Sequence, residues 1–281
     1  MAKTDNKVLA LIEADLAEIK ITDIDRTARC ARYDSIPPKL PIISGKTRLL
    51  LFEKINGFKD SPSFDAARAL LTRLAKDQDW DLVQSDNGAV FNDQQLSQFD
   101  VLIWNNISGD VLTYTQRDAF RKYIENGGGF VGIHGSGGDP HYHWDWYADD
   151  LIGARFIGHP KDPHYQTARI RVENNHSGVG KGLHNEWVLE EEWYSFKPSP
   201  RTKGSTIIAT IDENTYEPTG HYGTDLRMGD HPIAWHHCLK RGRSFYSAIG
   251  HRPEVYNNEH HIQLLLQGIQ WAAGLMGDTC K

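Results

Sequence analysis

The sequence predicts an α/β protein with a mostly parallel central sheet and helices on both faces. Two observations lead to this prediction. Short apolar runs alternate with segments of helical periodicity in the first half of the chain, and strands that alternate with helices pair in parallel. A glycine-rich run, residues 126–139, then joins a buried strand to a turn with His134 at its tip. Such turns mark the carboxyl edge of the sheet, where ligands of open α/β sheets bind.

Composition limits the class of protein. The 281 residues suffice for one large α/β domain, or for a domain with an extension. The net charge of −6 and the absence of a basic block argue against a nucleic-acid partner. No run approaches the roughly 18 apolar residues of a membrane span, and the polar N-terminus does not resemble a secretion signal. We therefore expect a cytoplasmic protein that has no membrane partner.

The cysteines and histidines give opposite indications about chemistry. The three cysteines, Cys30, Cys238 and Cys280, are odd in number and scattered, which argues against a disulfide framework and against a thiolate zinc site. The 14 histidines are numerous for this length and require a functional explanation.

The N-terminal part is expected to be separate from the main domain. Residues 7–29 have apolar side chains at helical spacing, and three prolines between residues 35 and 41 end this pattern. We divide the chain into a helical extension, residues 1–46, and an α/β domain, residues 47–276. The extension is expected to pack on the main domain or on a second subunit, which makes a homodimer a candidate assembly.

The first half of the α/β domain contains regular alternation. Apolar runs predict strands at 48–53, 80–84, 101–105 and 130–133. Helical periodicity predicts a helix over 61–76 capped at Ser61, a short one over 92–99, and one that begins at Thr113 or Thr115.

The pattern is looser beyond the glycine-rich turn. A helix is expected over 144–152, and a final helix begins after Asn257 or Asn258. Between them the sequence predicts strands at 167–173, 187–194, 205–211, 232–238 and 243–249.

His134 is the first candidate for chemistry. A side chain on a tight turn at a strand end is exposed and oriented, as in the nucleophile elbow of hydrolases. Here the residue is neither Ser nor Cys but His, which can act near neutral pH as a general base, a general acid or a metal ligand. A purely structural role, in which the ring bonds only its own loop, is the less favoured alternative.

Several stretches between Arg48 and Gly274 resemble the motifs of a known family. In chain order they are GGGFVGIH (127–134), GARF (153–156), GHP (158–160), EEWY (191–194), PIAW (232–235), GRSFY (242–246), GHRPEV (250–255) and IQWAAG (269–274). Through them the chain resembles the ThuA-like (trehalose utilisation) family, a branch of the class I glutamine amidotransferase-like, flavodoxin-like fold. The resemblance implies that fold and a place in sugar metabolism, in disaccharide use and 3-keto-sugar pathways.

The resemblance also excludes one activity. In the amidotransferases the elbow carries a catalytic Cys, and this chain has no Cys near position 134. Glutaminase acyl transfer through a thiolate is therefore excluded.

The predicted catalytic residues are His134, His159, Glu192 and His251. His159 lies in a proline-stiffened loop and matches a family motif, whereas His164, five residues later, fits a pocket or plain surface equally well. Strand alternation places Glu192 on the same face as Glu190, so a solvated acidic face is the alternative to a catalytic or metal-binding carboxylate.

His251 follows the last predicted strand. The resemblance implies a comparison with the catalytic His of an amidotransferase His-Pro-Glu run. Here Arg252 separates His251 from Pro253 and Glu254, which puts the role of Glu254 as an orienting group in doubt.

Predicted substrate-binding residues lie at strand ends or carry flat rings. Trp193 and Tyr194 offer surfaces on which a sugar can stack, although aromatic residues in strands are more often core. At most one of His236 and His237 faces the site, because neighbours in a strand point to opposite faces. The predicted set is Asn56, Asn105, Asp139, Trp193, Tyr194 and His236.

Two chemical interpretations fit these residues. In one, a divalent metal (Zn, Mn or Ni) binds His134, His159 and His251, with Glu192 as a further candidate ligand. In the other, the His and Glu side chains transfer protons without a metal. No nucleotide cofactor is expected, because no G-x-G-x-x-G run follows a strand.

Both interpretations describe an enzyme that acts on a small carbohydrate. Proton transfer beside a carbonyl suits isomerisation or elimination on a keto-sugar or uronate, and the same groups suit hydrolysis of a sugar. The alternative is a non-catalytic carbohydrate-binding or scaffold subunit with a degenerate elbow. The several histidines at strand ends favour the enzyme, because pure binding sites seldom need them.

Overall fold

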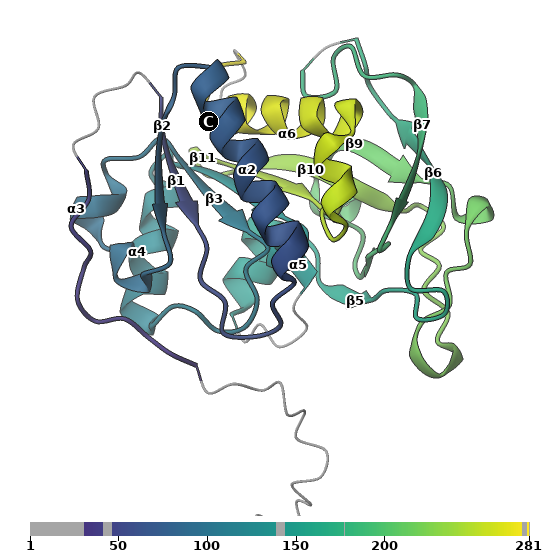
Figure 1. Ribbon diagram of the computed structural model, residues 1–281, viewed down its shortest axis with the longest axis horizontal. Coiled ribbons are helices and arrows are strands. Elements are labelled where there is room, and N and C mark those ends of the chain that lie inside the picture. The colour runs from purple at the N-terminus through teal and green to yellow at the C-terminus, as the bar shows by residue number, and fades with distance from the viewer. Residues whose placement is uncertain (1–30, 42–46, 139–143, 177, 277–279, 281) are drawn as a thin grey trace, which may run out of the picture. The chain divides into compact units, whose positions relative to one another are not determined.

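A nine-stranded mixed sheet is the centre of the fold in the computed structural model, which describes residues 31–41, 47–138, 144–176, 178–276 and 280 (Figure 1). The predicted helix over 7–29 and the candidate Asp139 lie outside these residues. The sheet order is β2-β1-β3-β4-β11-β10-β9-β6-β7, and β5 pairs with β8 in a separate two-stranded sheet. The strands are β1 (Arg48–Phe52), β2 (Asp81–Ser85), β3 (Val101–Asn105), β4 (Gly129–Ile133), β5 (Phe156–Gly158), β6 (Gln166–Val172), β7 (Glu186–Glu191), β8 (Ser195–Phe196), β9 (Thr206–Ile211), β10 (Pro232–Leu239) and β11 (Gly242–Ser247).

The sheet has a parallel half and an antiparallel half. Strands β2, β1, β3, β4 and β11 pair in parallel, and β11, β10, β9, β6 and β7 pair antiparallel. The predicted α/β fold with a parallel sheet is confirmed. The inner parallel strands β1, β3 and β4 are buried along nearly their whole length, as expected where helices cover both faces.

Helices flank the parallel half on both sides. Phe130 of β4 packs against Trp104 and Phe120, so helix α4 and segment η3 lie on that face. Phe245 packs against Gly268 of α6 on the opposite face, where Figure 1 shows α2 crossing in front of the strands. Besides five short 3-10 turns, η2 (Gly88–Val90), η4 (Pro200–Lys203), η5 (Glu213–Thr215), η6 (His221–Gly223) and η7 (Pro253–Asn257), the helical elements in the described residues are α2 (Ser61–Asp77), α3 (Asp93–Leu96), α4 (Tyr114–Glu125), α5 (Gly135–Gly138), η3 (Trp146–Ile152, a π-helical segment) and α6 (Glu259–Ala272).

Helix starts follow the capping side chains. Thr113 caps α4 in a reciprocal capping box with Gln116, which decides between the two predicted starts. The side chain of Asn258 caps α6 and accepts from two backbone N–H groups. The predicted cap at Ser61 is wrong by one residue, because Asp60 is the N-cap of α2 and Ser61 is its first helical residue.

The predicted strand over 187–194 ends three residues early. Pairing with β6 stops at Gln166 opposite Glu191, so Glu192 does not continue the alternation. The prediction that Glu190 and Glu192 share a face is therefore wrong: Glu190 is exposed, whereas Glu192 is 3% exposed. The physical reason is the Glu191 carboxylate, which turns inward and accepts backbone N–H groups from the loop after β11.

Residues 31–41, part of the predicted extension, pack on the α/β domain as an extended segment. The Asp34 carboxylate accepts from Lys54 Nζ at 2.6 Å and from the backbone N–H of Gly88 at 2.7 Å. Its carbonyl accepts from the Gln116 amide at 2.7 Å.

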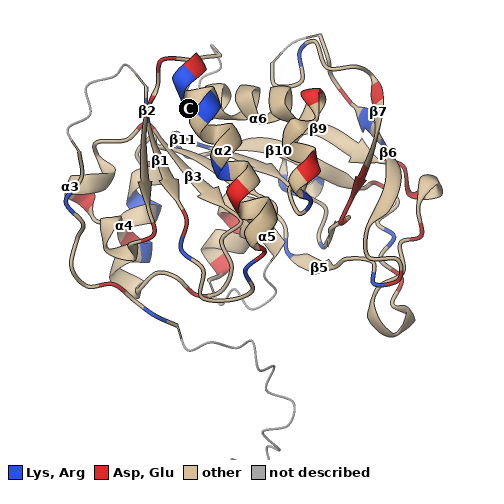
Figure 2. Cartoon of the chain, in the orientation of Figure 1, with Lys and Arg blue, Asp and Glu red and all other residues tan. Residues whose placement is uncertain are grey.

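Charges are mixed over the fold. Figure 2 shows acidic and basic residues interspersed along the helices and strands. In the part of the chain that the structure describes, no helix has both the length and the apolar character needed to cross a membrane.

One disulfide corrects the expectation drawn from the cysteines. Cys238 near the end of β10 is bonded to Cys280, which lies beyond α6. Scattered positions in the sequence concealed this pair, because the antiparallel extension of the sheet brings β10 close to the end of the chain. Disulfides are typical of oxidising compartments, and the cytoplasmic location expected from the sequence stays a prediction.

We expect Cys280→Ser to lower the free energy of unfolding by about 2–4 kcal/mol, because the cross-link restricts the unfolded chain over a separation of 42 residues. Thermal melts measure the loss. Reductant should lower the melting temperature of the wild type and of the control Cys30→Ser, and it should leave Cys280→Ser unchanged. Equal melting temperatures for all three proteins in the absence of reductant would contradict a structural disulfide.

Candidate active site

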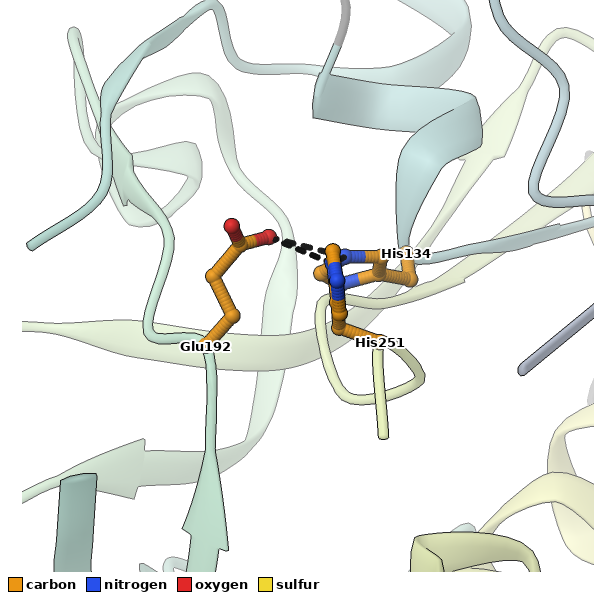
Figure 3. A group of neighbouring side chains, drawn as sticks. All are labelled: His134, Glu192 and His251. Atoms are coloured by element: carbon orange, nitrogen blue, oxygen red, sulfur yellow. Dashed lines mark hydrogen bonds and ion pairs between the residues drawn. The ribbon is translucent and has the colours of Figure 1, made fainter. Parts of the chain in front are cut away.

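A single buried carboxylate, Glu192, lies at the centre of a histidine cluster. In the described residues, Oε2 of Glu192 lies 3.1 Å from His134 Nε2 and 2.9 Å from His251 Nδ1 (Figure 3). Its other oxygen, Oε1, lies 3.3 Å from His159 Nδ1 and in close contact with His164 Nε2. We call these five residues the Glu192 cluster.

The two halves of the sheet each supply part of the cluster. His134 follows β4 and His251 follows β11, and these strands pair in parallel with Ile133 opposite Ser247. The backbone N–H of His134 donates to the Ser247 carbonyl at 2.7 Å. Glu192 comes from the end of β7 in the antiparallel half. The cluster thus lies at the carboxyl edge of the parallel strands, as the sequence predicts.

The turn at His134 is tightly specified. His134 has a positive φ of 40°, and its carbonyl accepts from the Tyr246 hydroxyl at 2.7 Å. Its ring Nδ1 lies 2.7 Å from the Ala248 carbonyl, which can only accept, so Nδ1 carries the proton of a neutral ring. Gly250, at φ 152°, leaves room for this turn, because a Cβ there would lie 2.9 Å from the His134 Cβ.

Tyr194 fixes the plane of the His134 ring. The two rings are stacked with centroids 4.1 Å apart, and the Tyr194 hydroxyl is hydrogen-bonded to Glu192. Gly138 allows the approach, because a Cβ there would lie 2.2 Å from the tyrosine ring. Burial raises the pKa of Tyr194 well above its ordinary value.

Burial and hydrogen bonding act in opposite directions on the cluster. Burial acts against ionisation of Glu192, but its hydrogen bonds with His134, His164 and His251 outweigh burial and hold its pKa below the ordinary value. Burial lowers the pKa of His134. For His251 burial has the same direction, yet the hydrogen bond with Glu192 and the charge of that carboxylate raise its pKa overall. The site therefore holds neighbouring imidazoles with different affinities for protons.

The adjacent carboxylate, Glu191, has a separate role. It is fully buried and accepts from the backbone N–H groups of Gly250, His251 and Arg252, at 3.0 to 3.4 Å. Burial raises the pKa of Glu191 to about 8. Because these donors belong to the loop after β11, Glu191 positions that loop and with it His251.

The structure brings all four predicted catalytic residues together but not most of the predicted substrate ligands. The Asn105 amide is fully buried and donates to Glu53, and the Asn56 amide donates to the Asp110 carbonyl at 2.6 Å. Trp193 is buried with its indole N–H on the Gln166 carbonyl. The ring of His236 lies 4.1 Å from that of Trp271. In the described residues these four side chains make contacts within the fold, and their predicted role in substrate binding stays a prediction.

Two residues of the site were not assigned by sequence reasoning. The sequence fits His164 equally to a pocket or to plain surface, and the structure places its ring against Glu192. Asp60 was missed: its carboxylate lies 3.5 Å from His251 Nε2. Its signal was available, because it follows the first strand directly before a helix start, at the same edge of the sheet.

Fold and site together define an α/β protein whose strand-to-helix elbow presents a histidine to a buried carboxylate. Comparison with known proteins identifies the family. The family model described as "Trehalose utilisation" (ThuA) matches residues 48–272, so the chain belongs to the ThuA family and is related to proteins of carbohydrate utilisation. No curated protein matches the sequence.

Solved structures agree with this assignment. A ThuA-like protein from Bacteroides uniformis is 25% identical with a TM-score of 0.70, over 85% of this chain and 95% of its own. A ThuA-like protein from Parabacteroides merdae is 16% identical with a TM-score of 0.61, over 84% of this chain and 92% of its own. The second similarity concerns the fold alone.

We expect Gly250→Ala to destabilise the protein by about 1–3 kcal/mol and to displace the His134 ring, because the new Cβ meets the His134 Cβ in a strained backbone conformation. Gly204→Ala is the matched control. It has a positive φ of 85° but no neighbour within 4 Å, so it reports backbone strain alone. Chemical denaturation measures both variants, and equal losses would contradict the close approach of the two loops.

A half-buried carboxylate outside the cluster, Glu213, predicts a pH effect on stability. Burial acts against ionisation of Glu213, but its hydrogen bonds with His231 and with the backbone N–H groups of Met228 and Gly229 lower its pKa from the ordinary 4.5. A lowered carboxyl pKa adds stability above pH 4.5, which is lost as the pH falls through the folded-state value. Glu213→Gln should therefore melt at a lower temperature than the wild type at pH 7, and the gap should close in acid. A gap that widens in acid would contradict it.

Proposed function

We propose that the protein is a carbohydrate-processing enzyme that acts on a sugar, keto-sugar or uronate through proton transfer by the Glu192 cluster. The observation that supports this most directly is the set of four imidazoles around one buried carboxylate at the carboxyl edge of the sheet. Perturbed titratable groups at such an edge are typical of acid–base catalysis. Membership of the ThuA family supports the carbohydrate part of the proposal.

His159 is the best placed general base. Its Nδ1 lies 2.9 Å from the Pro160 carbonyl and 3.3 Å from Glu192 Oε1. Both oxygens accept, so Nδ1 carries the proton and Nε2 keeps a lone pair for a substrate proton. The side chain is 24% exposed, and that of His164 is 35% exposed, so both are within reach of a ligand from solvent.

The chemistry that suits these groups is proton abstraction from a carbon beside a carbonyl. His159 takes the proton, and the electron pair of the C–H bond moves to the carbonyl oxygen to give an enolate. Protonation at the neighbouring carbon completes an isomerisation, whereas loss of a leaving group from the β-carbon completes an elimination. Keto-sugars and uronates carry the required carbonyl.

An aromatic surface for the sugar ring lies beside the cluster. Tyr165 is 38% exposed, and its ring stacks on His164 with centroids 4.5 Å apart. Tyr222 is exposed next to His221, whose ring lies 6.2 Å from that of His159. These rings take the stacking role that the sequence assigned to the buried Trp193.

A test follows the substrate hydrogen directly. In D2O the wild type should exchange the hydrogen beside the carbonyl of a keto-sugar or uronate substrate, observed by proton NMR. His159→Ala should slow this exchange at least about 100-fold, the lower bound of a general base's contribution. His176→Ala, a change of an exposed histidine outside the cluster, is the control and should keep the wild-type rate.

The same assay separates the enzyme from the competing function. A non-catalytic carbohydrate-binding subunit would bind the sugars, as seen by calorimetry, yet show no exchange and no turnover at any pH. That result in the wild type would overturn the proposal.

A further inference from the structure

We infer that His134, His251 and Glu192 form a site for one divalent transition-metal cation of the zinc, manganese or nickel type. The inference rests on the proposed function only for the use of the cation in catalysis. Binding itself follows from the geometry of three ligand atoms and is measured separately.

The three ligand atoms form a triangle of the right size. Glu192 Oε2 lies 3.1 Å from His134 Nε2 and 2.9 Å from His251 Nδ1, and the two nitrogens lie 3.2 Å apart. A cation with bonds of about 2.0–2.2 Å holds neighbouring ligands about 3 to 3.5 Å apart. The triangle therefore closes one face of a coordination shell with little movement of the side chains.

Proton counting gives an independent reason for a cation. The Ala248 carbonyl fixes the proton of a neutral His134 on Nδ1, so Nε2 directs a lone pair at Glu192. The Asp60 carboxylate, 3.5 Å from His251 Nε2, favours the proton on that nitrogen and a lone pair on Nδ1. Three lone pairs then converge on one point. A shared proton joins two of these atoms at a time, whereas a coordinated cation satisfies all three.

The surroundings have the form of an outer shell around a metal. Ligating histidines donate their second ring N–H to a carbonyl or carboxylate, and ligating carboxylates are hydrogen-bonded in turn. Here His134 donates to the Ala248 carbonyl and His251 faces Asp60. The second oxygen of Glu192, Oε1, is not part of the triangle and contacts His164. Glu191 adds a further support, because it holds the backbone of the His251 loop.

A second triple shares Glu192 but fits a cation less well. His159, His164 and Glu192 also lie close enough to hold an ion. However, His159 Nδ1 lies 2.9 Å from the Pro160 carbonyl, so this nitrogen carries a proton and offers no lone pair. The sequence placed His159 among the metal ligands; we favour proton transfer for it instead, because its Nδ1 is used by the Pro160 carbonyl.

Three protein ligands leave coordination positions open for a substrate, as in catalytic zinc sites. A bound cation would polarise a carbonyl or hydroxyl oxygen there. The protein's own part is then to hold the sugar beside Tyr165 and to accept the proton on His159. Imidazole and carboxylate ligands suit zinc, nickel and manganese.

The test measures cation binding to the full-length chain. Protein stripped with a chelator and dialysed is titrated with Zn²⁺ and with Mn²⁺ by calorimetry, and melting temperatures are recorded with and without each ion. We expect about one ion per chain and a raised melting temperature. His251→Ala should lose this binding, whereas His159→Ala and the surface control His176→Ala should keep it.

Second variants guard against misfolding. Glu192→Gln preserves shape but removes charge and should weaken binding, and Asp60→Asn should weaken it roughly tenfold through His251. Circular dichroism checks that each variant folds. Absence of a saturable site in the wild type would overturn the inference, and so would loss in His159→Ala with retention in His251→Ala, which would place the ion in the second triple.

The outcomes also separate this inference from the proposed function. A bound ion without hydrogen exchange on any sugar would support the metal site and contradict the enzyme. Exchange in a wild type that binds no ion would do the reverse.

Discussion

The burial of Glu192 is the constraint on which the rest of the site depends. An ionised carboxylate that is only 3% exposed is costly unless hydrogen bonds or opposite charge compensate for lost hydration. The Tyr194 hydroxyl and the His159 and His164 imidazoles provide part of that compensation, and the proposed cation shared with His134 and His251 would provide the rest. The loops that carry these side chains must therefore approach one point. Hydrogen bonds to Tyr246 and Ala248 hold the His134 turn there, and Glu191 holds the loop after β11.

Two adjacent carboxylates divide this work. Glu191 accepts from backbone N–H groups and so fixes the loop after β11, while Glu192 accepts only from side chains. A carboxylate whose oxygens are occupied by backbone N–H donors has no lone pair left for a ligand, so Glu191 has a structural role. Its neighbour Glu192 faces four imidazoles, which in the proposed function exchange protons or share a cation with it. The end of β7 is the point at which these two environments become available to consecutive residues.

The sequence predicted the parallel half of the fold and the turn at His134 because both are local. The predicted exposure of His134 is wrong, because Tyr194 stacks on its ring and leaves the residue 3% exposed. Strand spacing, the caps at Thr113 and Asn258, and the glycine run specify their own conformations. The errors are non-local. The alternation failed at Glu192 because strand pairing with β6 ends at Glu191, after which the chain turns Glu192 into the cluster as well. Asn105 was expected at an open strand end, but Glu53 and α2 cover it. The pairing order of the antiparallel half, which brings Cys238 to Cys280, has no local signal.

The elbow shows how a fold can keep its geometry and change its chemistry. His134 retains the positive φ, the strand-to-helix turn and the position at the carboxyl edge that orient a nucleophile elsewhere. An imidazole on the same turn is longer than a thiol or hydroxyl, so one nitrogen reaches the Ala248 carbonyl and the other reaches Glu192. The contact with Ala248 places the proton of the neutral ring on Nδ1. Nε2 therefore carries a lone pair and no hydrogen, unlike a thiol or a hydroxyl group at the same position. Under the proposed function and metal site, an imidazole at this elbow would coordinate a cation or accept a proton, where a thiol or hydroxyl would attack a carbonyl.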